Sequence, residues 1–302
     1  MGELIVSLAG TREGELLALA LTLLSAVSHA TFGAINKGGA DPFLNRGAIN
    51  LTYGLAMAPV ALLVVPWPSG IVWAALAAAF VVHLVYEWFQ ARSFETGDFT
   101  LVYPIARGTG PLATLALAVV VFGEEYGSGQ WAGAALLSAS ILGLAWANVA
   151  AARAEGRRLR GLRTAILAAL ATGGMIAIYT TVDAWGIRQA ADPFTFLAWF
   201  FFLGMFGFPL VALHRWRGLA EKPALGPLAV RGVFGAVIAV VSFGSIMLAT
   251  RVGKVGEVAA LREISIIFGT AIGVLVFREA IDARRLALIG LIAAGAVLVE
   301  VG

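Results

Sequence analysis

Apolar residues in this chain come in ten blocks of roughly 20, separated by short polar connections. An α-helix rises 1.5 Å per residue, so about 20 apolar residues cross a hydrocarbon core of about 30 Å. Each block is therefore predicted to be one membrane-spanning helix. The predicted spans cover 16–36, 43–65, 70–92, 99–122, 130–151, 164–188, 194–213, 228–250, 255–277 and 283–300.

Composition agrees with this pattern. The chain is 60% hydrophobic and 13% charged, whereas soluble domains are about 45–50% apolar and about 25% charged. The predicted fold class is an all-α integral membrane protein with ten transmembrane helices. The spans leave no room for a soluble catalytic or nucleotide-binding domain, and we assign the pI near 9.5 to cationic connections, not to a nucleic-acid surface. Because the chain has no cysteine, disulfides and thiolate metal sites are excluded.

Two short motifs occur twice and in the same order. ADPF occupies 40–43 and 191–194, an offset of 151, and VFGE at 121–124 corresponds to VFRE at 276–279, an offset of 155. Arg107 and Arg262 share the second offset. These matches indicate a duplication of five helices, with a first repeat at 1–151, a connection at 152–163 and a second repeat at 164–302. Since five is odd, the second copy enters the membrane from the opposite face, which predicts two inverted five-helix repeats.

The ADPF motif is interpreted as a corner between two helices. Proline cannot continue a preceding helix, and an aspartate before it is suited to cap the helix that follows. Asp41 and Asp192 are therefore predicted to be structural, not catalytic.

Cationic residues set the expected orientation, because cytoplasmic connections carry an excess of Lys and Arg. We therefore expect the 152–163 connection to be cytoplasmic and both termini to lie outside the cytoplasm, in the inner membrane of a bacterial-type cell. Four connection cations fall on the side of the N-terminus, namely Arg12, Arg188, Arg251 and Lys254, and fifteen fall on the other side, namely Lys37, Arg46, Arg92, Arg153, Arg157, Arg158, Arg160, Arg163, Arg215, Arg217, Lys222, Arg231, Arg278, Arg284 and Arg285.

The ten spans, the duplication, and the VFGE and VFRE corners followed by a span rich in Gly and Ala resemble the drug/metabolite transporter superfamily, specifically its ten-helix EamA-type exporters. The resemblance covers nearly the whole chain. It implies a secondary transporter that works by alternating access through a central cavity between the repeats and needs no cofactor. The aromatic inner spans with paired acid and base groups most resemble the branch that exports aromatic and other apolar amino acids.

Polar residues inside the spans are the candidate substrate ligands. An ionisable side chain at mid-bilayer costs at least ~2.5–3.5 kcal/mol on insertion scales, so those retained are expected to face a cavity or a partner. Several lie three or four positions apart and so on one helical face, as do His83, Tyr86 and Glu87, which form a polar stripe on the third span. We predict that these residues converge on one cavity between the repeats. The predicted substrate-binding residues are His83, Tyr86, Glu87, Tyr103, Arg107, Tyr179, Asp183, Ser242, Ser245 and Arg262.

A structural alternative stays open for each charged candidate. Arginine and carboxylate side chains near span ends also form interhelical ion pairs, and we give that interpretation the same weight as cavity lining. Trp67, Trp73 and Trp131 are predicted to lie in the interfacial aromatic belt. For Trp199 two positions are possible, either inward or on a lipid-facing wall. With few, separated histidines and no cysteine, no metal site is expected.

Small residues four apart predict close helix packing in the fifth and tenth spans, at Ala139 and Gly143 and at Gly290 and Ala294. We favour packing within one chain, because the duplication supplies the partner copy, and expect a functional monomer.

The predicted function is export of small metabolites, with amino acids of aromatic or other apolar type as the main candidate. An arginine or helix terminus would bind the carboxylate, and a Glu or Asp the ammonium. A multidrug or other metabolite exporter of the same fold is the alternative. An intramembrane enzyme is disfavoured, because G-x-S-x-G, H-E-x-x-H and the phosphate-binding loop are absent. The expected partners are a small-molecule substrate and the lipid bilayer, with no nucleic acid.

Overall fold

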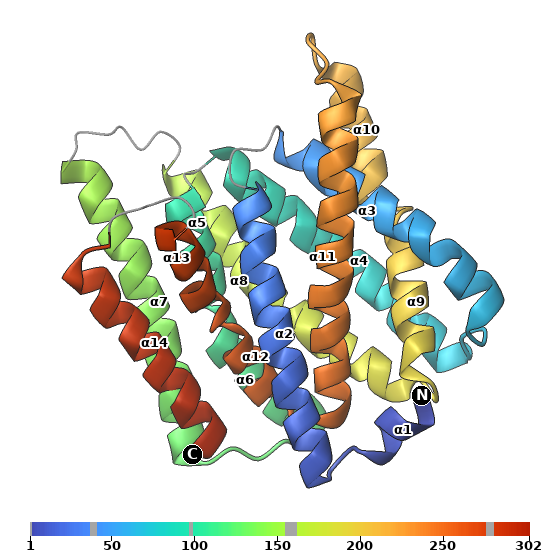
Figure 1. The fold of residues 1–302 in the computed structure, drawn as a ribbon, viewed down its shortest axis with the longest axis horizontal. Coiled ribbons are helices and arrows are strands. Elements are labelled where there is room, and N and C mark those ends of the chain that lie inside the picture. Colours follow the sequence, from blue (N-terminus) through green and yellow to red (C-terminus); the bar gives the residue numbers. More distant parts are fainter. Residues whose placement is uncertain (1, 37–40, 97–98, 155–161, 276–280) are drawn as a thin grey trace. The chain divides into compact units, whose positions relative to one another are not determined.

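The computed structural model describes residues 2–36, 41–96, 99–154, 162–275 and 281–302, and these ranges contain helices and no strand (Figure 1). One element, η1, is a short π-helix that continues α3. The elements are α1 (Gly2–Ser7), α2 (Arg12–Asn36), α3 (Pro42–Pro59), η1 (Val60–Val64), α4 (Gly70–Thr96), α5 (Phe99–Gly108), α6 (Gly110–Phe122), α7 (Ser128–Ala154), α8 (Leu162–Gln189), α9 (Pro193–Gly204), α10 (Phe208–Gly218), α11 (Leu225–Val252), α12 (Val255–Arg262), α13 (Ser265–Leu275) and α14 (Ala283–Val301).

Eight segments of the described chain are long and apolar enough to cross a membrane, and they coincide with the first eight predicted spans. The prediction of an all-α membrane protein is confirmed. The ninth predicted span corresponds to two helices, α12 and α13, with a break between them. The tenth corresponds to α14, which carries Arg284, Arg285 and Glu300. The count of ten spans therefore stays a prediction. The eight segments are Arg12–Phe32, Pro42–Val64, Gly70–Thr96, Val102–Phe122, Ser128–Ala147, Arg163–Gln189, Pro193–Gly218 and Leu225–Val252.

The two ADPF motifs act as helix caps, as predicted. α3 and α9 both begin at the proline of the motif, and the aspartate before it is the N-cap residue. The Asp41 carboxylate accepts hydrogen bonds from the amides of Phe43 at 2.9 Å and Leu44 at 3.4 Å. Asp192 accepts one from the amide of Phe194 at 3.0 Å. Ala40, the first residue of the first motif, lies outside the described residues.

The VFGE motif ends α6 and caps another helix. Gly123 has φ 66°, a left-handed conformation that glycine adopts without strain, and it terminates α6. The Glu124 carboxylate then accepts the backbone N–H of Val255, at 2.9 and 3.1 Å, at the start of α12. A carboxylate at this position satisfies a free amide and complements the positive end of the helix dipole. The matching VFRE motif at 276–279 lies outside the described residues.

Tyr126 belongs to the same connection. Its hydroxyl accepts the N–H of Gly256 at 2.9 Å and donates to the Glu124 carboxylate. Burial raises the pKa of Tyr126, and the hydrogen bond to Glu124 raises that pKa further. The phenol therefore stays protonated and remains a donor at neutral pH.

Two predicted spans are interrupted at equivalent positions. The sequence predicts unbroken spans at 99–122 and 255–277, with at most a bend at Pro104. In the structure α6 begins at Gly110 and α13 at Ser265, 155 positions apart, which is the offset of the VFxE motifs. α5 ends at Gly108, before the first break. Pro111 lies just after the break and has no backbone N–H to donate to a carbonyl of the preceding turn. This correspondence supports the duplication, while its inverted geometry stays a prediction.

The chain divides into two compact units, and each unit draws on both halves of the sequence. Unit 1 comprises Met1–Trp88 and Val182–Gly253, and unit 2 comprises Phe89–Thr181 and Lys254–Gly302. In unit 1, α11 packs against α2 and α3, and α3 packs against α9 and α10. In unit 2, α14 lies along α7, α7 packs against α5, and α6 packs against α12 (Figure 1). These spatial units differ from the two sequence repeats, whose limits stay predictions.

Close packing of α7 with α14 is confirmed within the chain. Gly143 faces α14 as predicted, since a Cβ there would lie 3.1 Å from the Leu288 side chain, but the closest backbone approach lies elsewhere. A Cβ at Gly133 would lie 2.7 Å from the carbonyl oxygen of Gly295, and one at Gly295 would lie 2.9 Å from that of Gly133. At Gly290, by contrast, a Cβ would meet nothing within 4 Å. The spacing therefore identified Gly143 correctly and Gly290 wrongly as a residue that faces the partner helix.

Gly295→Ala is expected to lower the free energy of unfolding by about 1–3 kcal/mol, because the added methyl group meets backbone atoms that cannot move aside. Gly290→Ala is the matched control on the same helix. It should be neutral or stabilising, since Ala is favoured over Gly inside helices. Thermal unfolding of the purified proteins in detergent compares the two, and equal losses would contradict the observed register.

Candidate functional site

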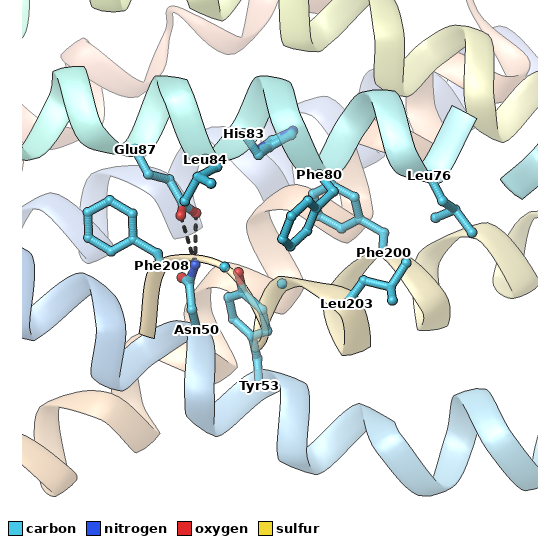
Figure 2. Close-up of a pocket in the computed structure, with 12 residues that line it drawn as sticks. Asn50, Tyr53, Leu76, Phe80, His83, Leu84, Glu87, Phe200, Leu203 and Phe208 are labelled. Atoms are coloured by element: carbon cyan, nitrogen blue, oxygen red, sulfur yellow. Dashed lines mark hydrogen bonds between the residues drawn. The ribbon is translucent and has the colours of Figure 1, made fainter. Parts of the chain in front are cut away.

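A pocket lies within unit 1, among α3, α4, α9 and α10 (Figure 2). Phenylalanines and leucines make up half of its lining residues. Polar groups come from Asn50 and Tyr53 on α3 and from His83 and Glu87 on α4. Such a combination of an apolar wall with a few polar groups is typical of small-molecule sites. The lining residues are Asn50, Tyr53, Leu76, Phe80, His83, Leu84, Glu87, Phe200, Leu203, Gly204, Gly207 and Phe208.

The contribution of α4 follows from helical spacing. Leu76, Phe80, His83, Leu84 and Glu87 lie at i, i+4, i+7, i+8 and i+11, which places them on one face. The prediction that His83 and Glu87 share a face is therefore confirmed.

Tyr86 belonged to the same predicted stripe but does not line this pocket. It is only 2% exposed, and the Arg46 guanidinium lies 5.8 Å from the centre of its ring. This distance is that of a cation–π contact.

Glu87 is held by two residues of α3. The two Asn50 Nδ2 contacts to its carboxylate oxygens are 2.8 and 3.0 Å long, and Arg46 Nη2 lies 2.9 Å from Oε1. Figure 2 shows Glu87 and Asn50 pointing toward one another from α4 and α3. A buried carboxylate requires such compensation, since its desolvation costs several kcal/mol. Among the described residues, Arg46 Nε and Asn50 Oδ1 have no hydrogen-bond partner.

The sequence predicts that Arg46 is a cation in a connection between spans, and this prediction is wrong. The structure places it in the second turn of α3, buried, with an acidic partner on α4. Asn50 and Tyr53 were missed altogether. The signal was present, because Arg46, Asn50 and Tyr53 lie at i, i+4 and i+7 on one face of an otherwise apolar span.

His83 forms a second polar pair in unit 1. Its Nε2 lies 2.8 Å from Oδ2 of Asp183 on α8, and the ring of Phe200 packs edge-on at 4.8 Å. Both polar side chains are buried. The pair joins a residue of the first predicted repeat to one of the second, so both halves of the sequence contribute to this region.

Within unit 2, the candidate residues contact one another and neighbouring polar residues. Arg107 Nε lies 2.8 Å from Oε2 of Glu263, and Arg107 Nη2 lies 3.5 Å from Ser265 Oγ. Arg262 Nη1 donates to the Tyr179 hydroxyl at 3.3 Å. This cluster lies beside the interruptions of both α5–α6 and α12–α13. Tyr103 lies one turn before Arg107 on α5. The charges of Arg107, Glu263 and Arg262 all act on its hydroxyl group.

Comparison with known proteins gives a match to a family model over part of the chain. Residues 163–301 match the model of the EamA-like transporter family. No curated protein matches the chain. One solved crystal structure of a protein aligns with a TM-score of 0.70 and 17% sequence identity, covering 96% of this chain and 98% of its own. At that identity the likeness shows a shared fold alone.

The EamA match associates the second half of the chain with a family of membrane transporters. Its limits nearly coincide with those of the second predicted repeat, 164–302. Asp183, Phe200 and Phe208 fall inside the EamA match, whereas Asn50 and Glu87 fall outside it. The pocket of unit 1 therefore combines EamA-matching residues with residues of the first half.

Ser242 and Ser245, the two candidate serines inside the EamA match, do not line the pocket. Ser242 exchanges hydrogen bonds with Ser25, whose hydroxyl donates to the Ser242 carbonyl at 2.7 Å, and this contact joins α11 to α2. Ser245 is buried but does not line the pocket. For Ser242 the structure therefore documents a contact between helices, and a role in substrate binding stays a prediction for both serines.

Trp199 also falls inside the EamA match. Of its two predicted positions, inward or on a lipid-facing wall, the structure shows the inward one. It is 3% exposed, and its ring centre lies 4.9 Å from those of both Trp67 and Trp73. The two outer indoles are exposed, as expected for belt residues. Within the described ranges, no group of three or more His, Asp or Glu residues is arranged to hold a metal ion.

Proposed function

We propose that the protein is a secondary transporter that exports small metabolites, with amino acids of aromatic or other apolar type as substrates. The pocket of unit 1 carries this proposal. Its phenylalanine rings suit an apolar side chain, and its buried polar groups at Asn50 and Glu87 suit a charged headgroup. The EamA match supports the transporter class, and the contribution of both sequence halves to the pocket agrees with a repeat-built transporter.

Membrane placement and orientation belong to the same proposal. Both termini are expected outside the cytoplasm, in an inner membrane. Without Arg46, fourteen of the fifteen cations assigned to the cytoplasmic side remain, against four on the other side, so the excess of cations that favours this orientation persists.

The test is counterflow in proteoliposomes made with the purified full chain. Labelled L-phenylalanine and L-leucine are expected to exchange well above protein-free liposomes, and L-glutamate is not. Phe200→Ala should weaken the apparent affinity for L-phenylalanine by a few-fold to about thirtyfold, because an aromatic contact of about 0.5–2 kcal/mol is lost. Repeating the assay with and without a pH gradient separates proton coupling from uniport.

Trp131→Ala is the control for this experiment, since Trp131 is an aromatic residue of unit 2 and does not line the pocket. It should transport like the parent. Absence of exchange for both apolar amino acids would contradict the proposal, and so would an unaltered affinity in Phe200→Ala.

A multidrug exporter is the second candidate, because a carboxylate beside aromatic rings also accommodates an organic cation. Labelled tetraphenylphosphonium serves as the probe. Exchange of this cation without exchange of any amino acid would assign the pocket to cationic drugs.

A further inference from the structure

We propose that the polar end of the pocket is an amine-recognition site, in which Asn50 Oδ1 and the Glu87 carboxylate accept hydrogen bonds from a primary ammonium group on an apolar body. The inference rests on the proposed function, because it names the chemical group by which the transported molecule is selected.

The orientation of the Asn50 amide is set by its neighbour. The amide nitrogen lies within 3.0 Å of both Glu87 oxygens, and a carboxylate can only accept, so the nitrogen must face Glu87. The carbonyl oxygen of the same amide is therefore left as an acceptor. Asn50 is 2% exposed, and this oxygen has no hydrogen-bond partner among the described residues.

An acceptor buried in this way is unfavourable unless a donor reaches it. Asn50 lines the pocket, so a molecule bound there is positioned to supply the missing donor. This is the observation that points to a ligand and not only to a structural network.

The surrounding groups favour an ammonium over a neutral hydroxyl. The Tyr53 hydroxyl and the Glu87 carboxylate also line this end of the pocket, next to Asn50 (Figure 2). An ammonium carries three donors, and its hydrogen bonds to these acceptors are charge-assisted, whereas a hydroxyl has one donor and no charge. Arg46 Nη2 lies 2.9 Å from Glu87 Oε1, so the carboxylate is already held in place where an ammonium would meet it.

The apolar part of the pocket defines the rest of the molecule. Phe80, Phe200 and Leu203 line it with apolar side chains, away from the carboxylate (Figure 2). A primary amine joined to an aromatic or branched body therefore fits both parts. Aromatic amino acids and simple arylalkylamines share this chemistry.

The experiment compares 2-phenylethylamine with 2-phenylethanol, which differ only in the polar group. Binding is measured by thermal stabilisation of the purified full chain in detergent. The parent is expected to bind the amine about tenfold more tightly than the alcohol. Asn50→Leu should reduce this preference to twofold or less.

Glu87→Gln provides a second variant that keeps the shape of the side chain and an acceptor for Asn50. It should weaken amine binding several-fold and leave alcohol binding unchanged. Thr52→Val is the matched control on α3, because the Thr52 hydroxyl donates within its own helix to the Ala48 carbonyl at 2.8 Å. It should keep the parent's preference.

Equal binding of amine and alcohol by the parent, binding of neither, or a full preference retained by Asn50→Leu would overturn the proposal. Counterflow of labelled L-phenylalanine separates this failure from that of the proposed function. Counterflow without amine preference removes the amine site and leaves the transporter. Amine preference that depends on Asn50, without counterflow of any labelled amino acid, leaves the site and removes the transporter.

Discussion

Arg46→Met is expected to lower the free energy of unfolding by about 3–5 kcal/mol, because it leaves the Glu87 carboxylate buried without its cationic partner. Asn50 would remain as a neutral donor, which does not replace a guanidinium. Thermal unfolding of the purified protein in detergent gives the size of the loss. Amide hydrogen exchange gives its position, and we expect faster exchange in α3 and α4.

Two further variants make this result specific. Arg92→Met removes an arginine whose partner is Glu95, at 2.6 Å, but whose side chain is 44% exposed, so the expected loss is below about 1 kcal/mol. The double variant Arg46→Met, Glu87→Met removes both buried charges and should recover much of the stability. If Arg46→Met and Arg92→Met were equally stable, the Arg46–Glu87 pair would not carry the energy assigned to it.

Features governed by neighbouring residues were predicted well from the sequence. The caps at Asp41 and Asp192 depend on a side chain and amides two or three positions later, so a tetrapeptide contains the information. The spans depend on runs of apolar residues, and eight of them coincide with helical segments long and apolar enough to cross a membrane. Both signals are local, and neither needs knowledge of the partner helices.

Arg46 shows where this reasoning fails. An arginine a few residues inside a span usually reaches the interface with its long side chain. Its burial depends on Glu87, which is 41 positions away in the chain and lies on another helix. Asn50 was missed for the same reason, because a single asparagine in an apolar span gains meaning only from the carboxylate opposite it.

The breaks between α5 and α6 and between α12 and α13 were only partly predictable from neighbouring residues. The residues Gly108 to Pro111 contain a recognisable helix-breaking signal, and its effect was underestimated. Glu263 and Ile264 contain none. Their amides bond to carbonyls three residues back, at Ala260 and Leu261. Only the repeat offset of 155 relates the second break to the first, so the duplication was more informative here than residue propensity.

Glu263→Leu is the second substitution with a large expected effect, about 3–5 kcal/mol, because it leaves the guanidinium of Arg107 buried without the carboxylate it now pairs with. Glu263→Gln should lose less, since its amide oxygen can still accept from Arg107 Nε. Glu257→Leu is the comparison on α12, because that side chain is 24% exposed and pairs with Lys254. It also accepts a hydrogen bond from Gln130 Nε2 at 2.6 Å, so we expect a loss smaller than that of Glu263→Leu but above zero.

Hydrogen exchange distinguishes this loss from that of Arg46→Met. Arg107 and Glu263 belong to unit 2, so exchange should increase in α5 and α12 and stay low in α3 and α4. Arg46→Met should give the reverse pattern. If both variants loosened the same helices to the same degree, the two buried ion pairs would not stabilise separate units. If Glu263→Leu were as stable as Glu257→Leu, the junction between α12 and α13 would not depend on its ion pair with α5.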